Sequence, residues 1–200
     1  MRKFAVSKCG LRKGSIALDV ACGTGMLCIE LAKVVGNKGK VIGVDFCENM
    51  LEIGKRNISK TAYNNIIELR HGNAMELPFD DNTFDCATIG FALRNVPDVE
   101  KAIREMKRVV KPGREVVSLE FSKPSLPVFK ELYYLYFEKI LPFIGKVFVG
   151  TEKPYSYLPQ SLKVFLHQKD LCELFKKVGF KNAHYHELTG GIVSVHVGTV

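Results

Sequence analysis

Several features are missing from this sequence of 200 residues, and each absence excludes a class of protein. The six cysteines form no CxxC pair and lie inside apolar patterns, which argues against a disulfide framework or a zinc site and indicates reduced core thiols. No metal is therefore expected. No stretch reaches the roughly 18 apolar residues that a membrane span requires. Without internal repeats or a low-complexity linker, the chain is expected to form one cytoplasmic domain over residues 1–200.

Charge and hydropathy narrow the class further. A hydrophobic content of 46% can bury a full core, which argues against disorder. The net charge of +8 favours anionic partners, either nucleic acid or an acidic lipid surface. Basic surfaces without such a partner are about equally common, so charge alone does not choose between them.

The chain is organised around residues 16–25, which read IALDVACGTG. Alternating apolar residues predict a buried strand, and Gly23 and Gly25 interrupt the pattern just before a helix that begins near Met26. Glycines let a ligand approach the backbone, and the helix directs its free N–H groups at it. The alternative is an ordinary tight turn between a strand and a helix.

The rest of the chain alternates strands and helices. The apolar pattern places Val34 on the buried side of the first helix. A later helix is expected to be capped by Asp98, and its buried stripe continues to Val110, where Lys111-Pro112-Gly113 ends the helix. The turn Thr189-Gly190-Gly191 predicts an antiparallel hairpin. The expected class is therefore α/β, a Rossmann-like seven-stranded, mainly parallel sheet with helices on both faces and a C-terminal antiparallel hairpin. Strands are expected at 16–20, 41–45, 66–70, 84–89, 115–120, 181–188 and 192–200, and helices at 25–35, 48–58, 99–110 and 169–178.

One stretch breaks the alternation. Eleven of the twenty aromatic residues lie between Phe121 and Phe165. Their helical spacing fits a core helix, but aromatic residues on more than one side fit a hydrophobic lid or pocket wall as well. Both interpretations stay open for an insert at about 122–165.

The glycine loop departs from a dinucleotide site. The pattern G-x-G-x-x-G needs a third small residue, and Cys28 occupies that place. Asp19, inside the first strand, would repel a pyrophosphate but could meet a positively charged ligand group or organise the loop.

Two further polar residues follow successive strands. Asp45 ends the second strand, where a carboxylate accepts hydrogen bonds from ribose hydroxyls. Asn73-Ala74 follows the third strand, where an amide can pair with an adenine edge, although Gly72-Asn73 also forms turns without a ligand. A ribose and an adenine without a pyrophosphate suggest S-adenosylmethionine.

At this point the chain resembles the class I S-adenosylmethionine-dependent methyltransferases, and specifically the ubiquinone/menaquinone biosynthesis C-methyltransferases. The resemblance spans nearly all of the chain, and its most specific parts are the LRNV and LEFSKP motifs. It is carried by LDVACGTG, GVDFCENML, GNAMELPFDDNTFD, GFALRNVPD, RVVKPGREVVSLEFSKP, YSYLPQS and TGGIVSVHVG.

The resemblance implies a set of cofactor-binding residues. They would hold S-adenosylmethionine and release S-adenosylhomocysteine. The glycine loop would bind the amino-acid part of the cofactor, Asp45 would bind the ribose, and the loop after the third strand would bind the adenine. The expected residues are Asp19, Gly23, Thr24, Gly25, Asp45, Phe46, Asn73, Ala74 and Gly90.

The chain also departs from the family pattern. Arg114 replaces a glycine that is usual in the K-P-G-G turn. Relatives carry several dozen residues before the segment that matches 2–6, including a Tyr-Asp-x-Met-Asn stretch that helps cover the cofactor. We therefore expect this arm to be absent and the site to be less completely covered.

The acceptor implied by the resemblance is a polyprenylated quinol, demethylmenaquinol or a ubiquinone precursor, whose ring carbon attacks once a neighbouring hydroxyl loses its proton. Arg94 is expected to favour the oxyanion and Asn95 to orient it. The alternative for both residues is to brace the loop before Pro97. His167 could approach a substrate hydroxyl, and the other four histidines are expected to be structural.

The expected partners are this lipophilic quinol and, transiently, an anionic membrane at its inner face. Nucleic acid is not expected, because the loop GFALRN lacks the patterns of nucleobase methyltransferases. A homodimer is left open. The alternative functions are a methyltransferase for another apolar small molecule, such as a sterol or a phenol, and a cofactor-binding protein without activity.

Overall fold

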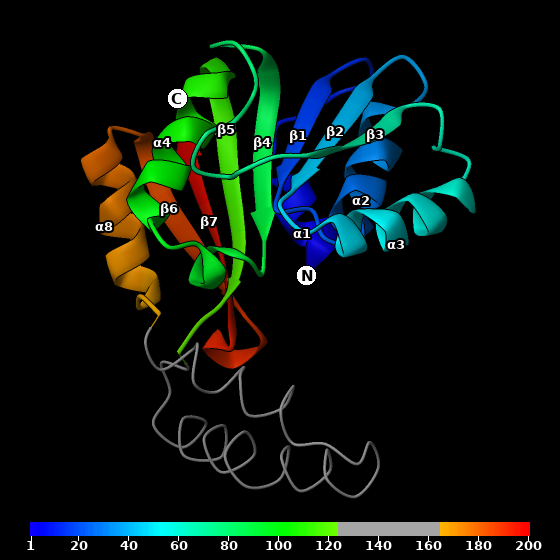
Figure 1. The fold of residues 1–200 in the computed structure, drawn as a ribbon. Helices are drawn as coiled ribbons and strands as arrows, with labels where there is room; N and C mark the ends of the chain where they lie inside the picture. The colour runs from blue at the N-terminus through cyan, green and yellow to red at the C-terminus, as the bar shows by residue number, and fades with distance from the viewer. Residues whose placement is uncertain (124–164) are drawn as a thin grey trace, which may run out of the picture.

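A seven-stranded sheet in the order β3-β2-β1-β4-β5-β7-β6 forms the centre of the molecule. The computed structural model describes residues 1–123 and 165–200, and the expected insert at 122–165 lies almost wholly outside them. Strands β1 to β5 are parallel, and β7 pairs antiparallel with both β5 and β6 (Figure 1). This confirms the predicted fold class. The strands are β1 Ile16–Val20, β2 Lys40–Asp45, β3 Ile67–His71, β4 Phe84–Gly90, β5 Val110–Phe121, β6 Lys181–Leu188 and β7 Val193–Thr199.

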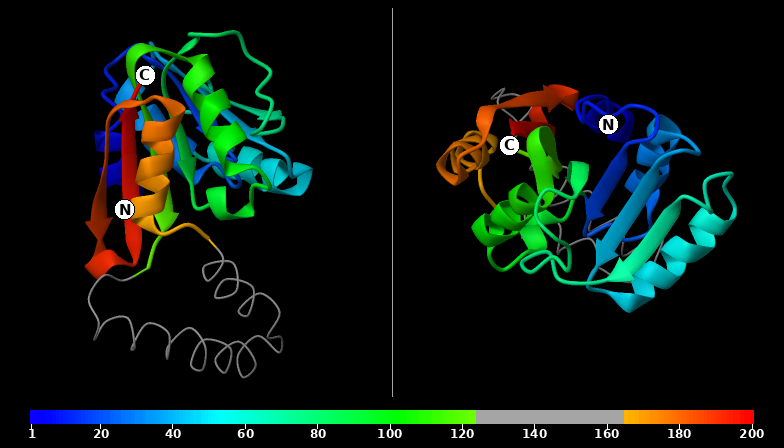
Figure 2. Two further views of the ribbon diagram at one scale, coloured as in Figure 1. Left: turned by 90° about the vertical axis from the view of Figure 1, so that its left-hand side faces the viewer. Right: turned by 90° about the horizontal axis from the view of Figure 1, so that it is seen from above.

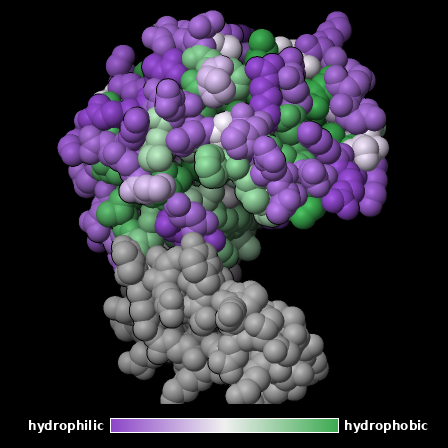
Figure 3. Space-filling view, in the orientation of Figure 1, coloured by the Kyte–Doolittle hydropathy of each residue, from purple (hydrophilic) through white to green (hydrophobic). Residues whose placement is uncertain are grey.

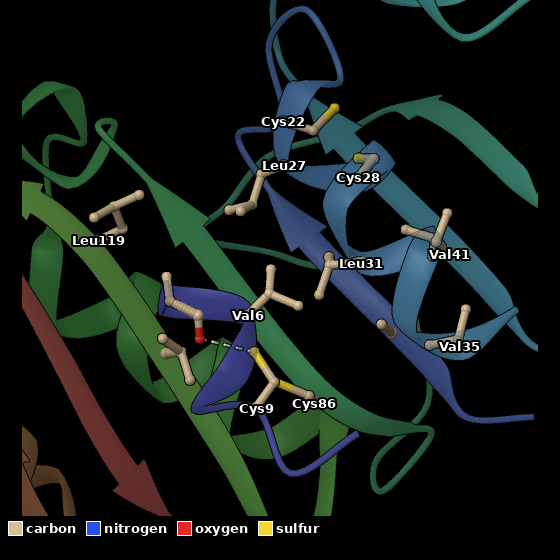
Figure 4. Close-up of a cluster of buried hydrophobic side chains, with 14 of the residues drawn as sticks. Val6, Cys9, Cys22, Leu27, Cys28, Leu31, Val35, Val41, Cys86 and Leu119 are labelled. Atoms are coloured by element: carbon tan, nitrogen blue, oxygen red, sulfur yellow. Dashed lines mark hydrogen bonds between the residues drawn. The ribbon is translucent and has the colours of Figure 1, made fainter. Parts of the chain in front are cut away.

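Helices pack on both faces of this sheet (Figure 2). One apolar cluster joins α1, α2 and α3 to one face, and a second cluster joins α4 and α8 to the other. Figure 4 shows part of the first cluster, where Val6 of α1 lies beside Leu27 and Leu31 of α2. The helices are α1 Arg2–Ser7, α2 Met26–Val35, α3 Glu48–Ser59, α4 Val99–Val109 and α8 Gln168–Val178, and the short 3₁₀ turns are η1 Leu93–Asn95 and η3 Thr189–Gly191.

Local signals in the sequence account for the helix ends. Asp98 caps α4, because its side chain accepts a hydrogen bond from the Lys101 backbone N–H at 2.9 Å. Gly179 ends α8 in a left-handed conformation, with φ of 89°. Cys47 supplies no side-chain cap to α3, as its residue type predicts.

Four expectations need correction. Val34 is exposed and its neighbour Val35 is buried, because the buried stripe of α2 follows Leu31 and Ala32. Val110 does not continue α4. It starts β5 by pairing with Phe84, so that the strand includes the 111–113 segment.

The third correction concerns β3, which is displaced by one residue from the predicted 66–70. The fourth concerns the short elements α1 and η1, which the apolar pattern of the sequence did not predict. A single turn or two of helix is too short to carry an apolar repeat, and tertiary packing decides its conformation. No helix in the described part of the chain is long and apolar enough to cross a membrane.

Candidate cofactor and acceptor site

A cavity of about 650 Å³ opens at the carboxyl ends of β1 to β4, the lower edge of the sheet in Figure 1. Ligands of open α/β sheets bind at this edge, where the strand order reverses between β1 and β4. In the space-filling view, mildly hydrophobic side chains gather just above the grey residues (Figure 3). The lining includes nearly every cofactor residue expected from the sequence, namely Asp19, Gly23, Thr24, Asp45, Phe46, Asn73, Ala74 and Gly90.

The glycine loop after β1 has the conformation that its sequence requires. Gly23 and Gly25 have φ of 53° and 75°, in the left-handed region that favours glycine. Gly25 also precedes α2 without offering a side-chain cap, so backbone N–H groups of the first turn remain directed toward the cavity. Ala21 shares the left-handed conformation, with φ of 52°, which is unusual for a residue with a Cβ atom.

Asp45 holds this loop. One carboxylate oxygen accepts the Gly23 N–H at 2.7 Å, and the other accepts the Cys47 N–H at 2.8 Å. The end of β2 is thereby tied both to the glycine loop and to the start of α3. A carboxylate that already accepts two hydrogen bonds retains lone pairs for ligand hydroxyls.

Asp19 does not organise the loop, which corrects one of its two expected roles. It is 1% exposed, and among the described residues its hydrogen-bond partners are Thr88 of β4 and Cys28 of α2, at 2.8 Å and 3.3 Å. Burial raises the pKa of Asp19 to about 7, although both hydrogen bonds lower it. A buried carboxylate at the wall of a cavity is suited to a cationic ligand group.

The loop after β3 forms the turn that its sequence allows. The side-chain oxygen of Asn73 accepts the Met75 N–H at 2.9 Å, as in an Asx turn. Phe46, which also lines the cavity, is 73% exposed, and its ring lies 5.5 Å from that of His71, which ends β3. An exposed aromatic face beside an amide side chain is a suitable environment for a planar base.

The end of β4 brings the backbone close to α2. A Cβ atom at Gly90 would lie 3.2 Å from the side chain of Leu27, so glycine keeps this wall open. Phe91 follows in the left-handed region, with φ of 58°. Strained residues of this kind cluster at functional sites, and this one turns the chain across the cavity.

The two residues expected at the acceptor end have different surroundings. Asn95 lines the cavity, whereas Arg94 is not among the described lining residues. The Arg94 guanidinium donates to the Phe91 carbonyl oxygen at 2.7 Å, forms an ion pair with Glu120 of β5, and lies 5.2 Å from the Phe121 ring centre. This geometry is that of the loop-bracing alternative.

Glu120 was not singled out from the sequence. Its side chain is 1% exposed, and burial raises its pKa although the Arg94 charge opposes the shift. Its second carboxylate oxygen and the Arg94 Nε are buried and have no hydrogen-bond partner among residues 1–123 and 165–200. The LEFSKP motif contains Glu120, but no local pattern indicates that it pairs with Arg94, 26 residues earlier.

Arg2 was also missed as a lining residue. It lies in the first turn of α1, which was not predicted, so its place at the cavity follows from tertiary packing. The histidines lie outside the lining: His167 accepts the Lys169 N–H at the start of α8, and His196 is buried in β7. The described residues contain no group of three potential metal ligands.

Comparisons with known proteins identify the family of the chain. The model of the ubiE/COQ5 methyltransferase family matches residues 1–200. Demethylmenaquinone methyltransferase of Staphylococcus aureus (strain JH9) is 50% identical over 197 residues, which cover 98% of this chain and 80% of the relative.

Solved structures share the fold at lower identity. A SAM-dependent methyltransferase from Aquifex aeolicus superposes with a TM-score of 0.73 at 21% identity, over 100% of this chain and 89% of the other. The YcgJ protein of Bacillus subtilis gives a TM-score of 0.66 at 21% identity, over 94% and 70% of the two chains.

Proposed function

The chain belongs to the ubiE/COQ5 methyltransferase family, and on that premise we propose that its acceptor is a demethylmenaquinol, methylated at a ring carbon. It is a methyltransferase that uses S-adenosylmethionine and forms S-adenosylhomocysteine. The observation that carries the choice of acceptor is the 50% identity to a demethylmenaquinone methyltransferase over 98% of the chain.

We propose that the residues at the first three strand ends hold the cofactor. Asp45 would accept the ribose hydroxyls, and Asn73 with Ala74 would face the adenine beside Phe46. Gly23, Thr24 and Gly25 would follow the amino-acid part, and Gly90 would leave room for it. Their common place in the cavity lining and the free backbone N–H groups of α2 support this assignment.

When bound, the cofactor supplies a methyl group activated by a sulfonium. The chain's task is then to align the acceptor carbon with that methyl group and to exclude water. Apolar side chains at the β4 end of the cavity support such a role, because a quinol ring is flat and largely apolar. They are Leu27, Phe91, Ala92, Val96, Pro97 and Leu119.

For the acceptor we propose that Asn95 orients the hydroxyl that loses its proton, since Asn95 lines the cavity. Arg94 is then a positioning residue. Its bond to the Phe91 carbonyl oxygen and its ion pair with Glu120 fix the loop that carries Asn95. Arg94 would contact the oxyanion only through a bridging water.

Labelled methyl transfer tests the acceptor. S-adenosylmethionine with a labelled methyl group is offered with demethylmenaquinol, with a demethylated benzoquinol and with a simple phenol in parallel. We expect the naphthoquinol to be methylated at carbon with the highest kcat/KM. Faster transfer to the phenol would favour the alternative acceptor class, and binding of S-adenosylhomocysteine without transfer to any acceptor would contradict the proposal.

A transient contact with an anionic membrane is also proposed. Three exposed apolar side chains, Met26, Phe46 and Met50, lie at the cavity, and the net charge of +8 favours an anionic surface. We expect more co-sedimentation with vesicles that contain phosphatidylglycerol than with phosphatidylcholine alone, and less at high salt. Equal co-sedimentation with both would contradict the contact.

A further inference from the structure

The charged side chains of the cavity have an uneven distribution. Among the described lining residues three are charged: Asp19, Asp45 and Arg2. The carboxylates come from β1 and β2, whereas Arg2 comes from α1, which packs in the same apolar cluster as α2. Arg2 is thus the single cation in the described lining of a cavity that otherwise carries negative charge.

Packing fixes Arg2 in this place. Ala5 and Val6 of α1 are buried in the same apolar cluster as Leu27 and Leu31 of α2 (Figure 4). The helix is therefore anchored by its second half, and its first turn reaches the cavity. Lys3 is the next residue along and is exposed outside the lining, so the two neighbouring cations differ in what they face.

The sheet order separates Asp19 from the residues assigned to adenine, and Arg2 is related to the site through Asp19. Asn73 and Asp45 follow β3 and β2, and Asp19 lies on β1 beside β4, so the polar groups run across the strand ends in that sequence. Arg2 is close enough to Asp19 for its charge to lower the pKa of that carboxylate, against the larger effect of burial. The Asp19 end is therefore the end away from the residues assigned to ribose and adenine.

On the basis of the proposed cofactor site, we propose that the Arg2 guanidinium binds the carboxylate of the cofactor's amino-acid part. In S-adenosylmethionine this part carries a carboxylate, an ammonium and the sulfonium, and with the ribose at Asp45 it would lie toward Asp19 of β1. Asp19 meets the positive charge, and Arg2 meets the negative one. A guanidinium suits a carboxylate because its planar donors can bond both oxygens.

The same arrangement makes α1 part of the binding site. In its absence the carboxylate would face Asp19 and Asp45 without a counter-ion, which is unfavourable in a partly enclosed cavity. Ligands that contain the adenosine but no carboxylate do not need Arg2. This difference between ligands provides the test.

Calorimetry with two ligands isolates the contact. We would measure S-adenosylhomocysteine and its decarboxylated analogue against the unsubstituted chain, Arg2→Ala and the matched control Lys3→Ala. For S-adenosylhomocysteine we expect Arg2→Ala to weaken binding about tenfold to a hundredfold, the range for a charged hydrogen bond. For the decarboxylated analogue we expect a change of less than about twofold, and Lys3→Ala should bind both ligands normally. Arg2→Lys should recover part of the loss.

Each other outcome contradicts a different statement. Equal weakening of both ligands, or no weakening of either, would overturn the Arg2 assignment while leaving the methyltransferase proposal intact. Unchanged binding with a raised KM for the quinol would instead place Arg2 at the acceptor. If the unsubstituted chain bound neither ligand, the cofactor site itself would be wrong. Unfolding curves of the variants separate these effects from loss of fold.

Discussion

The two sides of the sheet use buried polar groups in different ways. Beside β5, β7 and β6, the buried Gln168 of α8 links neighbouring segments. It donates to the Lys123 carbonyl oxygen and to Glu187, at 3.0 Å each, and its own carbonyl oxygen accepts from His196 Nε2 at 2.8 Å. In β1 to β3 the polar groups lie at strand ends beside a cavity, as Asp19 and Asp45 do.

This difference separates groups that stabilise the fold from groups kept for a ligand. Burial shifts the pKa of both Asp19 and His196, although each has a hydrogen bond within the protein. Asp19 differs because it lines the cavity, whereas His196 does not. The Arg94–Glu120 pair lies between the two sides, joining the loop after β4 to β5. Substitutions in the three regions should therefore have different signatures.

The largest effect is expected at this pair. Arg94→Ala leaves a buried carboxylate without its counter-ion, which costs about 3 to 5 kcal/mol of the free energy of unfolding. The double variant Arg94→Met with Glu120→Leu should recover most of this loss, because it removes both charges. It also removes Arg94 Nε and a Glu120 oxygen, two buried atoms without a hydrogen-bond partner in the described part of the chain. Denaturant unfolding measures both.

The methyl-transfer activity of the double variant then shows whether the Arg94–Glu120 pair positions the acceptor loop or only stabilises the fold. If the double variant is stable but transfers methyl groups slowly, with an unchanged affinity for S-adenosylhomocysteine, the pair positions the acceptor loop. A double variant that is as unstable as Arg94→Ala would contradict the account of an uncompensated charge.

On the cavity side, Asp45→Asn should weaken binding of S-adenosylhomocysteine about a hundredfold. The amide loses the charge that accepts the Gly23 and Cys47 N–H groups together with ligand hydroxyls, and each charged hydrogen bond contributes about 1.5 to 3 kcal/mol. Glu52→Gln is the matched control, since it changes the same charge on the exposed side of α3. Equal affinities for the two variants would remove Asp45 from the site.

On the other side, His196 makes stability depend on pH. Burial lowers its pKa to about 4, below its ordinary value of 6.5, so the unfolded chain binds a proton that the folded chain refuses. Above about pH 6.5 the neutral imidazole does not reduce the free energy of unfolding. As the pH falls from 6.5 toward 4, protonation of His196 in the unfolded chain lowers the free energy of unfolding, by about 2 kcal/mol at about pH 5.

The His196→Gln variant supplies the comparison, because an amide can still donate to the Gln168 carbonyl but does not titrate. Unfolding curves at about pH 7.5 and 5 should show a smaller decrease for His196→Gln than for the unsubstituted chain. Parallel decreases would assign the acid sensitivity to other groups.

Much of this architecture could be predicted from the sequence, because its signals are local. Glycines with left-handed φ, the Asp98 cap and alternating apolar strands each report their own conformation, and strand order then brings Asp45 and Asn73 to one edge. Arg2, Thr88 and Glu120 could not be assigned in this way. Their roles depend on partners from other elements, at separations such as the 69 residues between Asp19 and Thr88.

The roles of the two cavity carboxylates show the same limit. The sequence places Asp19 closer to the glycine loop, four residues before Gly23, and so suggests that it braces the loop. The structure gives this task to Asp45, which is 22 residues from Gly23 along the chain. Asp19 is left with a buried charge that the empty protein does not need.

The smallest effect tests this last point. Because the pKa of Asp19 is raised to about 7, the folded chain holds a proton that the unfolded chain releases between about pH 4 and 7. Stability therefore falls as pH rises through this window, and the full cost, about 4 kcal/mol for a shift of about three units, is present above it. Asp19→Asn removes this cost but loses one buried hydrogen bond, worth up to about 3 kcal/mol, so we expect a net gain of at least about 1 kcal/mol at about pH 8. At about pH 3, below the ordinary pKa of 3.8, the carboxyl is mostly protonated in both states, and the same variant should be less stable than the unsubstituted chain. A gain in stability at about pH 8 together with weaker binding of S-adenosylhomocysteine would mark Asp19 as a residue kept for its ligand, whereas a loss of stability at both pH values would make it part of the structural core, like His196.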